Sequence, residues 1–320
     1  DVPIKARTGR EDEINQCLRC YSCFSECDAT CHFLCAINPV IGNEYEAKFD
    51  LSPKYKKKVL VAGGGISGMQ AALTCAERGH EVILCEKTAE LGGILLCEEQ
   101  VPFKKKLKLY LEKQKRMVER SGIEVRLNTE VTKELAAEIA PDVIIAAMGA
   151  TPIKPDIPGI ESDKVFGAVE IYKNPQLAGE RVVIIGGGLV GVELAIFLSI
   201  RGSKVTILEM MPSLNYGASG VHGAFLDLKI PEYGITVELS TKALEINDRG
   251  VVGKDQSGKR KVFPADTVVY AVGLKPQWER ANELRQMAKE FYQIGDCLAP
   301  RNILMANQEG YYAAKDIGRY

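Results

Sequence analysis

The sequence predicts an α/β protein with two Rossmann-like dinucleotide-binding domains, preceded by a small cysteine-rich segment. Three observations carry this prediction. A glycine-rich turn joins an apolar strand to a helix twice, several longer segments recur in the two halves, and six of the ten cysteines lie between Cys17 and Cys35. A chain of 320 residues has room for two domains and a small appendage.

The first glycine motif lies in KVLVAGGGISG, residues 58–68, between an apolar strand and a helix. Gly63 permits the tight turn, Gly65 lets the backbone approach a pyrophosphate, and Gly68 lets the helix pack closely on the strand. A phosphate is expected at the helix N-terminus, where free N–H groups and the helix dipole favour negative charge. The next strand ends in Glu86, where a carboxylate can accept hydrogen bonds from both ribose hydroxyls.

The same pattern recurs in RVVIIGGGLVGVELAIFLSIRGSKVTILE, and the distance from the first glycine to the acid is 23 positions in both copies. Two copies with matched acids favour two nucleotide sites over two unrelated glycine-rich turns. Residues 122–129 also match 234–241, and residues 142–152 match 266–276. Each half is therefore predicted to be one complete nucleotide-binding domain. The second motif consists of Gly186, Gly188, Gly191 and Glu209.

The order of the segments predicts that the second domain is inserted into the first. Residues 51–155 and 274–320 are expected to form the first domain, and residues 156–273 the second. After the second half, the chain runs through a strand-like stretch, a loop and a helix, which can add a last strand and helix to the first sheet. Asp296 then lies at a strand C-terminus, where ligands bind in such sheets. Residues 1–50 form a separate linker segment.

The N-terminal cysteines predict a metal centre. Cys17, Cys20 and Cys23 form a C-x2-C-x2-C run, which favours an iron–sulfur cluster over zinc, because structural zinc sites usually show two separated pairs of ligands. Zinc remains the alternative. Adding Cys27 reproduces the bacterial ferredoxin spacing, but no proline follows it and no second ligand set exists.

Composition excludes several function classes. The net charge of −1 and pI near 6.4 give no broad basic face, so neither nucleic acid nor an anionic membrane is the expected partner. No apolar run approaches the ~18 residues of a membrane helix, and the first residues lack the apolar stretch of a signal peptide. We therefore expect a soluble, cytoplasmic protein.

These residues, in this order, resemble the flavoproteins that carry an NAD(P)H domain inserted into an FAD domain. The resemblance covers residues 55–320. It implies that Asp296 binds the ribityl chain and that the helix after Asn302 points its N-terminus at the flavin pyrimidine edge. The residues that it assigns to FAD are Gly63, Gly65, Ser67, Gly68, Glu86, Lys87, Gly92, Gly93, Val131, Gly149, Gly295, Asp296 and Ile303. Those assigned to NAD(H) are Gly186, Gly188, Leu189, Val190, Gly191, Glu193 and Glu209.

The cysteine segment resembles more narrowly the linker of the iron–sulfur flavoenzymes typified by 2,4-dienoyl-CoA reductase, trimethylamine dehydrogenase and bile-acid enoate reductases. In that family the linker follows an FMN-containing barrel, and the present chain resembles only the part after the barrel. The family pattern selects Cys35 as the fourth ligand, so the 4Fe–4S set is Cys17, Cys20, Cys23 and Cys35, with Cys27 and Cys31 as spares.

The resemblance implies an electron-transfer module. NADH reduces FAD by hydride transfer, and single electrons pass to the 4Fe–4S cluster and on to an FMN barrel that reduces an enoate-type C=C substrate. Glu209 favours NADH, because its charge repels the 2′-phosphate of NADPH. No general acid or base is required. A self-contained NADH-dependent diaphorase and a nucleotide-binding scaffold with a structural metal are the alternatives, and an oligomer is possible.

A few residues have ordinary structural interpretations. Cys75, Cys85, Cys97 and Cys297 are expected to be small buried apolar side chains, and Cys97 lacks the partner of a redox-active cysteine pair. His80 is expected to be a surface cap, and His32 and His222 have no recognisable partner. Glu193 is either a nicotinamide contact or an exposed helix carboxylate.

Overall fold

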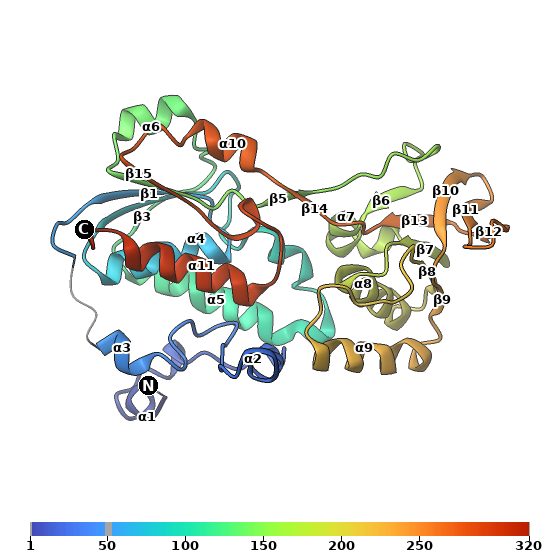
Figure 1. The fold of residues 1–320 in the computed structure, drawn as a ribbon, viewed down its shortest axis with the longest axis horizontal. Coiled ribbons are helices and arrows are strands. Elements are labelled where there is room, and N and C mark those ends of the chain that lie inside the picture. The colour runs from blue at the N-terminus through green and yellow to red at the C-terminus, as the bar shows by residue number, and fades with distance from the viewer. Residues whose placement is uncertain (1, 49–52, 320) are drawn as a thin grey trace. The chain divides into compact units, whose positions relative to one another are not determined.

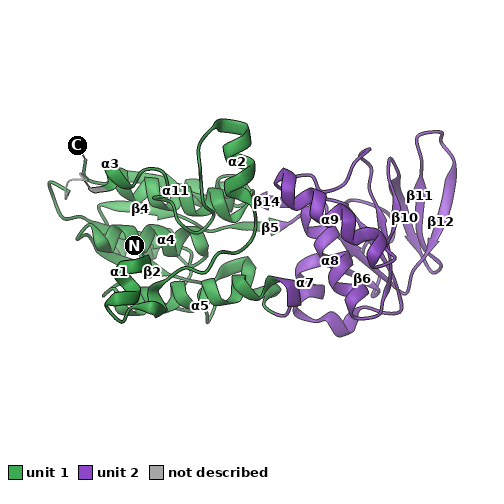
Figure 2. Ribbon diagram, turned by 90° about the horizontal axis from the view of Figure 1, so that it is seen from below, with its two compact units in different colours: residues 1–99, 104–151, 276–320 green, residues 100–103, 152–275 purple. Residues whose placement is uncertain are grey.

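A computed structural model describes residues 2–48 and 53–319, which fall into two compact units. Unit 1 comprises residues 1–99, 104–151 and 276–320, and unit 2 comprises residues 100–103 and 152–275 (Figure 2). Residues 49–52 of the predicted linker boundary lie outside the described residues. The predicted boundaries, which separate residues 1–50 from the FAD-binding domain, stay predictions.

Unit 1 is built on a five-stranded parallel sheet in the order β15-β4-β1-β2-β3. The three central strands, β4, β1 and β2, are buried on both faces, as their continuous apolar runs predict, whereas the edge strands β15 and β3 are only partly buried. The predicted return of the chain is confirmed, because β15 pairs with β4 in this sheet. The strands are β1 Lys58–Ala62, β2 Glu81–Cys85, β3 Glu124–Arg126, β4 Val143–Ala146 and β15 Glu290–Gln293.

Helices cover both faces of this sheet (Figure 1). Val59, Val61 and Leu84 point into one core with α4, α5 and α11, whereas Leu60 and Ile83 point into a second core with α6. This alternation follows from the two-residue period of a strand. The helices are α4 Ile66–Glu77, α5 Lys105–Arg120, α6 Lys133–Ile139, α10 Trp278–Glu283 and α11 Ile303–Asp316.

The N-terminal segment of unit 1 carries short helices, and one of its loops reaches into the core. Ala36 and Ile37 are 3% and 5% exposed and belong to the core cluster that holds α4 and α11. The elements of this segment are α1 Val2–Arg7, η1 Glu11–Glu13, α2 Ser22–Thr30 and α3 Glu44–Lys48.

Unit 2 repeats the plan with a parallel sheet in the order β6-β13-β7-β8-β9, and adds a three-stranded antiparallel sheet, β10-β11-β12. The chain enters and leaves it through β5 Ala150–Pro152 and β14 Leu274–Pro276, which pair with each other. The remaining elements are β6 Val165–Gly167, α7 Ala168–Lys173, β7 Arg181–Ile185, α8 Leu189–Ile200, β8 Lys204–Leu208, α9 Gly220–Glu232, β9 Thr236–Glu238, β10 Lys242–Asn247, β11 Gly250–Lys254, β12 Arg260–Pro264 and β13 Thr267–Tyr270.

The two units repeat each other at the level of single hydrogen bonds. Thr129 N donates to Glu86 O in unit 1, and Thr241 N donates to Glu209 O in unit 2. The strand pairs β1–β2 and β7–β8 also keep the same register. The predicted internal repeat is therefore present in the fold itself, and the predicted α/β architecture is confirmed.

Candidate cofactor sites

In the first glycine turn, Gly63 and Gly68 have no room for a side chain, whereas Gly65 does. A Cβ on Gly63 would lie 2.3 Å from the carbonyl oxygen of Ala147, and one on Gly68 would lie 1.9 Å from that of Gly63. Gly65, the N-cap of α4, has nothing within 4 Å of its Cβ position. The open side of the turn therefore faces away from the sheet, at the helix N-terminus where a phosphate binds well.

A buried hydroxyl at the start of α4 fits a bound phosphate. Ser67 is 8% exposed, and its Oγ has no hydrogen-bond partner among the described residues. Gly295 lies against it, because a Cβ there would be 2.8 Å from the Ser67 Cβ. Buried polar atoms are rarely left without a partner. An FAD pyrophosphate held at this turn would supply an acceptor for the hydroxyl.

Glu86 holds the first glycine turn in place through a hydrogen bond. Its carboxylate is 6% exposed, and Oε2 accepts a 2.7 Å hydrogen bond from Gly64 N. Oε1 accepts hydrogen bonds from the backbone N and the Oγ1 of Thr88 at 2.9 and 2.8 Å. Sequence reasoning assigned this acid to the ribose alone. The structure adds a second role, since the carboxylate already fixes the conformation of the glycine turn before any ribose is bound.

Glu209 repeats this arrangement in unit 2. Its Oε2 accepts a 2.6 Å hydrogen bond from Gly187 N, and its Oε1 accepts one of 2.7 Å from Met211 N. The side chain is 8% exposed. Because each carboxylate oxygen has more than one lone pair, the two acids keep acceptor capacity for ribose hydroxyls.

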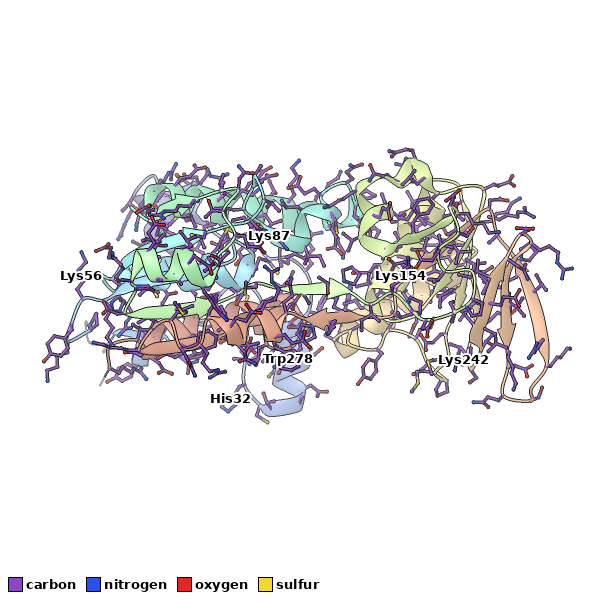
Figure 3. The ribbon with its side chains drawn as sticks, turned by 90° about the horizontal axis from the view of Figure 1, so that it is seen from above. His32, Lys56, Lys87, Lys154, Lys242 and Trp278 are labelled. Carbon is purple, nitrogen blue, oxygen red and sulfur yellow. The ribbon has the colours of Figure 1, made fainter. Side chains whose placement is uncertain are left out.

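The other residues assigned to FAD lie on three further segments of unit 1. Gly92 N donates to Gly64 O at 2.9 Å, and a Cβ on Gly93 would be 3.1 Å from the Gly65 Cα, so this pair lies beside the open side of the turn. Gly149 has a φ of +74° in the turn after β4. Val131 is 5% exposed, and Lys87 is exposed at the end of β2 (Figure 3).

Asp296 lies just beyond β15, where its carboxylate is half-buried and can accept hydrogen bonds. Its Oδ1 accepts a 3.3 Å hydrogen bond from Arg301 N, and burial raises the pKa of its carboxyl above the ordinary value. Gly295 N donates to Glu309 Oε2 at 2.6 Å, and Glu309 pairs with the Arg301 guanidinium. As predicted, a helix begins after Asn302: the Asn302 side chain caps α11 by accepting from Met305 N at 3.0 Å, and Ile303 is the first residue.

The second glycine turn resembles the first, with one difference. A Cβ on Gly186 would be 2.4 Å from Ala271 O, and one on Gly191 would be 2.0 Å from Gly186 O. The nearest atom to a Cβ on Gly188 is the Tyr216 carbonyl oxygen at 3.6 Å, and Leu189 N donates to that oxygen at 3.4 Å. The loop after β8 therefore already occupies one N–H at the start of α8. Val190, next in the helix, is 42% exposed.

Glu193 and His222 form a pair that sequence reasoning missed. Glu193 is 4% exposed in α8, so its interpretation as an exposed helix carboxylate is wrong. His222 Nε2 lies 3.1 Å from Glu193 Oε1 and approaches it from α9. The two residues are 29 positions apart on different helices, and no local pattern signals such a contact.

The expectation that His80 is a surface cap is also wrong. His80 is 6% exposed, and its Nδ1 accepts a 3.2 Å hydrogen bond from Lys57 N. Burial lowers the pKa of the imidazole, which suits a neutral acceptor. The expectation for the four scattered cysteines is confirmed: Cys75, Cys85, Cys97 and Cys297 are all buried and free of disulfides.

The N-terminal cysteines are only partly brought together. Among residues 2–48 and 53–319, no group of three His, Cys, Asp or Glu side chains is close enough to hold a metal. Burial raises the pKa of the Cys35 thiol, the N–H groups of Ile37 and Asn38 oppose this shift, and Cys20 and Cys23 are near enough to raise it further. Cys27 lies on α2, where its carbonyl caps the helix end.

The sulfur atoms also receive hydrogen bonds of the kind that tune iron–sulfur clusters. Arg19 N donates to Cys17 Sγ at 3.3 Å, and Ser22 Oγ donates to Cys20 Sγ at 3.4 Å. Such bonds stabilise negative charge on sulfur. The donor set therefore fits a cluster chemically, although the thiols are not gathered around one point.

Comparison with known proteins identifies the family. A family model described as pyridine nucleotide-disulphide oxidoreductase matches residues 57–310. The chain belongs to this family. It is therefore an oxidoreductase that binds FAD and NAD(H). Within the described residues, no helix has both the length and the apolar character needed to cross a bilayer. A cytoplasmic location stays a prediction.

Three known proteins are similar to this chain along nearly its whole length. NADH oxidase of Thermoanaerobacter brockii is 34% identical over 330 residues, covering 98% of this chain and 50% of that protein. Cinnamate reductase of Clostridium sporogenes is 32% identical over 322 residues, which cover 99% of this chain and 48% of that protein. The solved structure of 2-naphthoyl-CoA reductase superimposes with a TM-score of 0.92 at 30% identity, and the match covers 99% of this chain and 48% of that one.

These relatives confirm the recognition of the chain as similar to the FAD- and NAD(H)-binding part of larger flavoenzymes. The chain spans about half the length of the curated relatives it matches. The iron–sulfur cluster, the FMN barrel and the individual site residues stay predictions.

Proposed function

We propose that the chain is an NADH-oxidising electron-transfer module. NADH binds in unit 2 and delivers a hydride to FAD in unit 1, and single electrons leave through a 4Fe–4S cluster. The observation that carries this proposal is the pair of matched glycine turns, each with a glycine where a Cβ would meet no clash and a buried acid bonded to the turn. Flavin supplies the conversion from two-electron to one-electron chemistry.

The chain's own residues supply binding and orientation. In the first site, Ser67 Oγ and the N-terminus of α4 bind the FAD pyrophosphate, and Asp296 accepts from the ribityl hydroxyls. In the second site, Gly188 leaves room for the NADH pyrophosphate, and Glu209 accepts from the adenosine ribose. The Glu209 charge, buried beside Gly187, disfavours a 2′-phosphate and so selects NADH.

For the cluster we propose the ligands Cys17, Cys20, Cys23 and Cys35. The influence of Cys20 and Cys23 on the pKa of the Cys35 thiol supports Cys35 as the fourth ligand. Cluster binding is then expected to bring the four thiolates together, because metal binding is coupled to the folding of such segments. Replacing Cys35 by Ser should remove the cluster absorbance, whereas Cys27→Ser should keep it. The reverse result would overturn the ligand set, and zinc in place of iron would overturn the cluster.

The acceptor beyond the cluster is proposed to be an FMN-binding barrel that reduces a conjugated C=C bond. The support comes from the relatives, two of which are named as a cinnamate reductase and a 2-naphthoyl-CoA reductase.

Anaerobic titration with NADH tests the proposed function. The chain is loaded with FAD, iron and sulfide, and the flavin absorbance and the electron paramagnetic resonance of the cluster are followed together. Reduction of both groups is expected. Reduction of the flavin with an oxidised cluster would indicate a diaphorase that acts directly at FAD, and reduction of neither would indicate a nucleotide-binding scaffold. Both of these results would overturn the proposal.

A further inference from the structure

A buried polar network ties the Cys35 loop to the helix that lies beside the first glycine turn. Asn307, in α11, is fully buried, and its Nδ2 donates to Ala36 O at 2.5 Å. Its Oδ1 accepts a 3.2 Å hydrogen bond from Tyr110 OH, which in turn accepts one of 2.9 Å from Gln114 Nε2. The three side chains come from α5 and α11, and 271 positions separate Asn307 from Ala36.

The network fixes the direction of the Asn307 amide. Burial raises the pKa of Tyr110 far above its ordinary value, so its hydroxyl remains a donor at every ordinary pH. A donor facing Oδ1 leaves Nδ2 to face the loop. Ala36 and Ile37 are buried in the same core as α4 and α11, so solvent cannot replace this hydrogen bond.

The next turn of α11 lies against the start of α4, which follows the first glycine turn. A Cβ on Gly310 would be 2.5 Å from Ser67 O, and the segment before the helix brings Gly295 against the Ser67 side chain. One rigid helix of 14 residues therefore contacts the predicted flavin pyrophosphate turn and, through Asn307, the residue next to Cys35.

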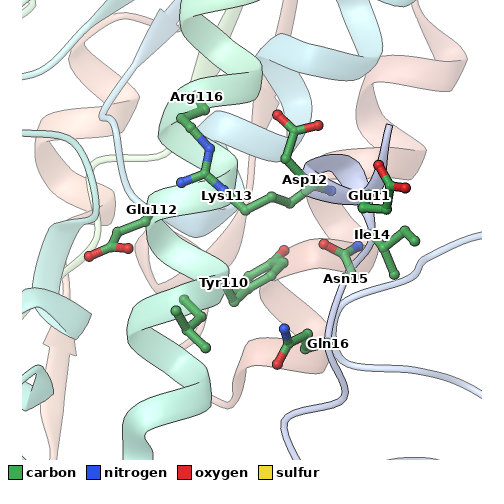
Figure 4. Close-up of a pocket in the computed structure, with 10 residues that line it drawn as sticks. Glu11, Asp12, Ile14, Asn15, Gln16, Tyr110, Glu112, Lys113 and Arg116 are labelled. Atoms are coloured by element: carbon green, nitrogen blue, oxygen red, sulfur yellow. The ribbon is translucent and has the colours of Figure 1, made fainter. Parts of the chain in front are cut away.

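The same loop has a second, independent tether. Asn15 Nδ2 donates to Ile37 O at 2.9 Å. Asn15 and Tyr110 both line a cavity of about 130 Å³ between residues 11–16 and α5 (Figure 4). Asn15 therefore holds the loop from the N-terminal segment and has no hydrogen bond to α11. It provides a matched control for Asn307.

We propose that Asn307 is a positioning residue for electron exit, which holds the loop that carries Cys35 against α11 so that electrons leaving the flavin cross to the cluster through the Asn307–Ala36 hydrogen bond. This inference rests on the proposed function. NADH gives two electrons and a proton to FAD as hydride. The electrons then leave one at a time, each reducing the cluster by one electron, the proton passes to solvent, and ferricyanide serves as the final acceptor in the test.

The test compares Asn307→Asp with Asn15→Ala in the full chain carrying FAD and the cluster. Asn307→Asp keeps the volume but replaces the donor to Ala36 O by a second oxygen. Rapid mixing with NADH should show unchanged flavin reduction and cluster reduction slowed by about tenfold. This is the order expected if losing ~1.4 kcal/mol of hydrogen bonding lowers tenfold the equilibrium constant for contact between Ala36 and α11, and the rate follows that constant. Asn15→Ala should leave cluster reduction near the parent rate.

Several readouts separate this role from simple loop support. Iron content should not change in Asn307→Asp, while amide hydrogen exchange at residues 36–38 should rise even in the cofactor-free chain. Equal slowing in Asn15→Ala, or an unchanged rate in Asn307→Asp, would overturn the proposal. If Asn307→Asp does not fold, Tyr110→Phe, which frees the amide to rotate, should slow the same step, and an unchanged rate there counts against it. Failure of the parent chain to reduce its cluster would instead overturn the proposed function.

Discussion

His222 Nε2 lies 3.1 Å from the Oε1 of Glu193, a carboxylate that is only 4% exposed at the start of α8. A buried carboxylate needs partners, because an ionised group taken out of water loses its hydration. The contact joins α8, which begins at the second glycine turn, to α9. It therefore links the helix at the proposed nucleotide site to the helix that follows the loop after β8.

Removing this contact should cost stability. His222→Ala is expected to lower the free energy of unfolding by about 1.5–3 kcal/mol, the usual range for a hydrogen bond to a charged group. Denaturant unfolding measures the change. His32→Ala is the control, because His32 is exposed and should be replaceable without effect. Equal losses in the two variants would contradict the structural role of the pair.

The glycines of the first turn should separate folding from cofactor binding. Gly65→Ala is expected to fold with near-parental stability and to bind FAD weakly, because its Cβ meets no protein atom within 4 Å but enters the space of the pyrophosphate. Gly68→Ala should fail to fold or lose several kcal/mol, since its Cβ would be 1.9 Å from Gly63 O. Circular dichroism and flavin fluorescence titration measure the two effects.

Gly188→Ala offers the same comparison for NADH in unit 2, where the nearest atom would be at 3.6 Å. Retained FAD with weakened NADH binding is expected. Loss of FAD with unaffected NADH binding in this variant would show that the two sites are assigned to the wrong units.

Asp296 is expected to destabilise the flavin-free fold and to contribute to FAD binding. Its pKa is raised by burial, so the folded state holds the proton more tightly than the unfolded state. In the flavin-free protein, the free energy of unfolding should therefore fall as pH rises from about 4 through the raised pKa. Asp296→Asn should remove this fall, raise the melting temperature at pH 7 without flavin, and weaken FAD binding. Asp163→Asn, at an exposed position, should change neither quantity, and a more stable Asp296→Asn that binds FAD normally would contradict the assignment.

Lys113 should make stability rise in mild alkali. Burial is the main cause that lowers its pKa from 10.5 to about 8, and Lys5 and Arg116 lower it further, whereas Glu13 and Glu77 oppose the shift. The folded protein releases this proton at a lower pH than the unfolded chain, so the free energy of unfolding should increase between about pH 8 and 10.5.

Lys113→Met should remove that increase and stabilise the protein at pH 7 by about 1–2 kcal/mol, after allowance for partial solvent screening. Urea unfolding across the pH range measures it. Lys108→Met on the same helix, where the side chain is 48% exposed, should leave the slope unchanged. A slope that survives in Lys113→Met assigns the effect to another group.

Local patterns predicted much of the fold. Apolar runs ending in glycine gave β1 and β7, and the acid 23 positions later located the ends of β2 and β8. The repeated segments predicted a second domain built on the plan of the first. The order of segments also predicted that the last strand, β15, joins the first sheet. These features are readable because strand burial, turn geometry and helix starts each depend on neighbouring residues.

By itself, the sequence determined the two glycine turns, their acids and the α/β class, because each depends on residues within one strand–turn–helix unit. Only the tertiary structure decided the partners of Glu193, His80 and Asn307, and the use of Glu86 and Glu209 as supports for their turns. Those contacts join segments that are 22 to 271 positions apart. They form because burial leaves polar groups no water to bind, and the partner is whichever donor or acceptor the packing brings near.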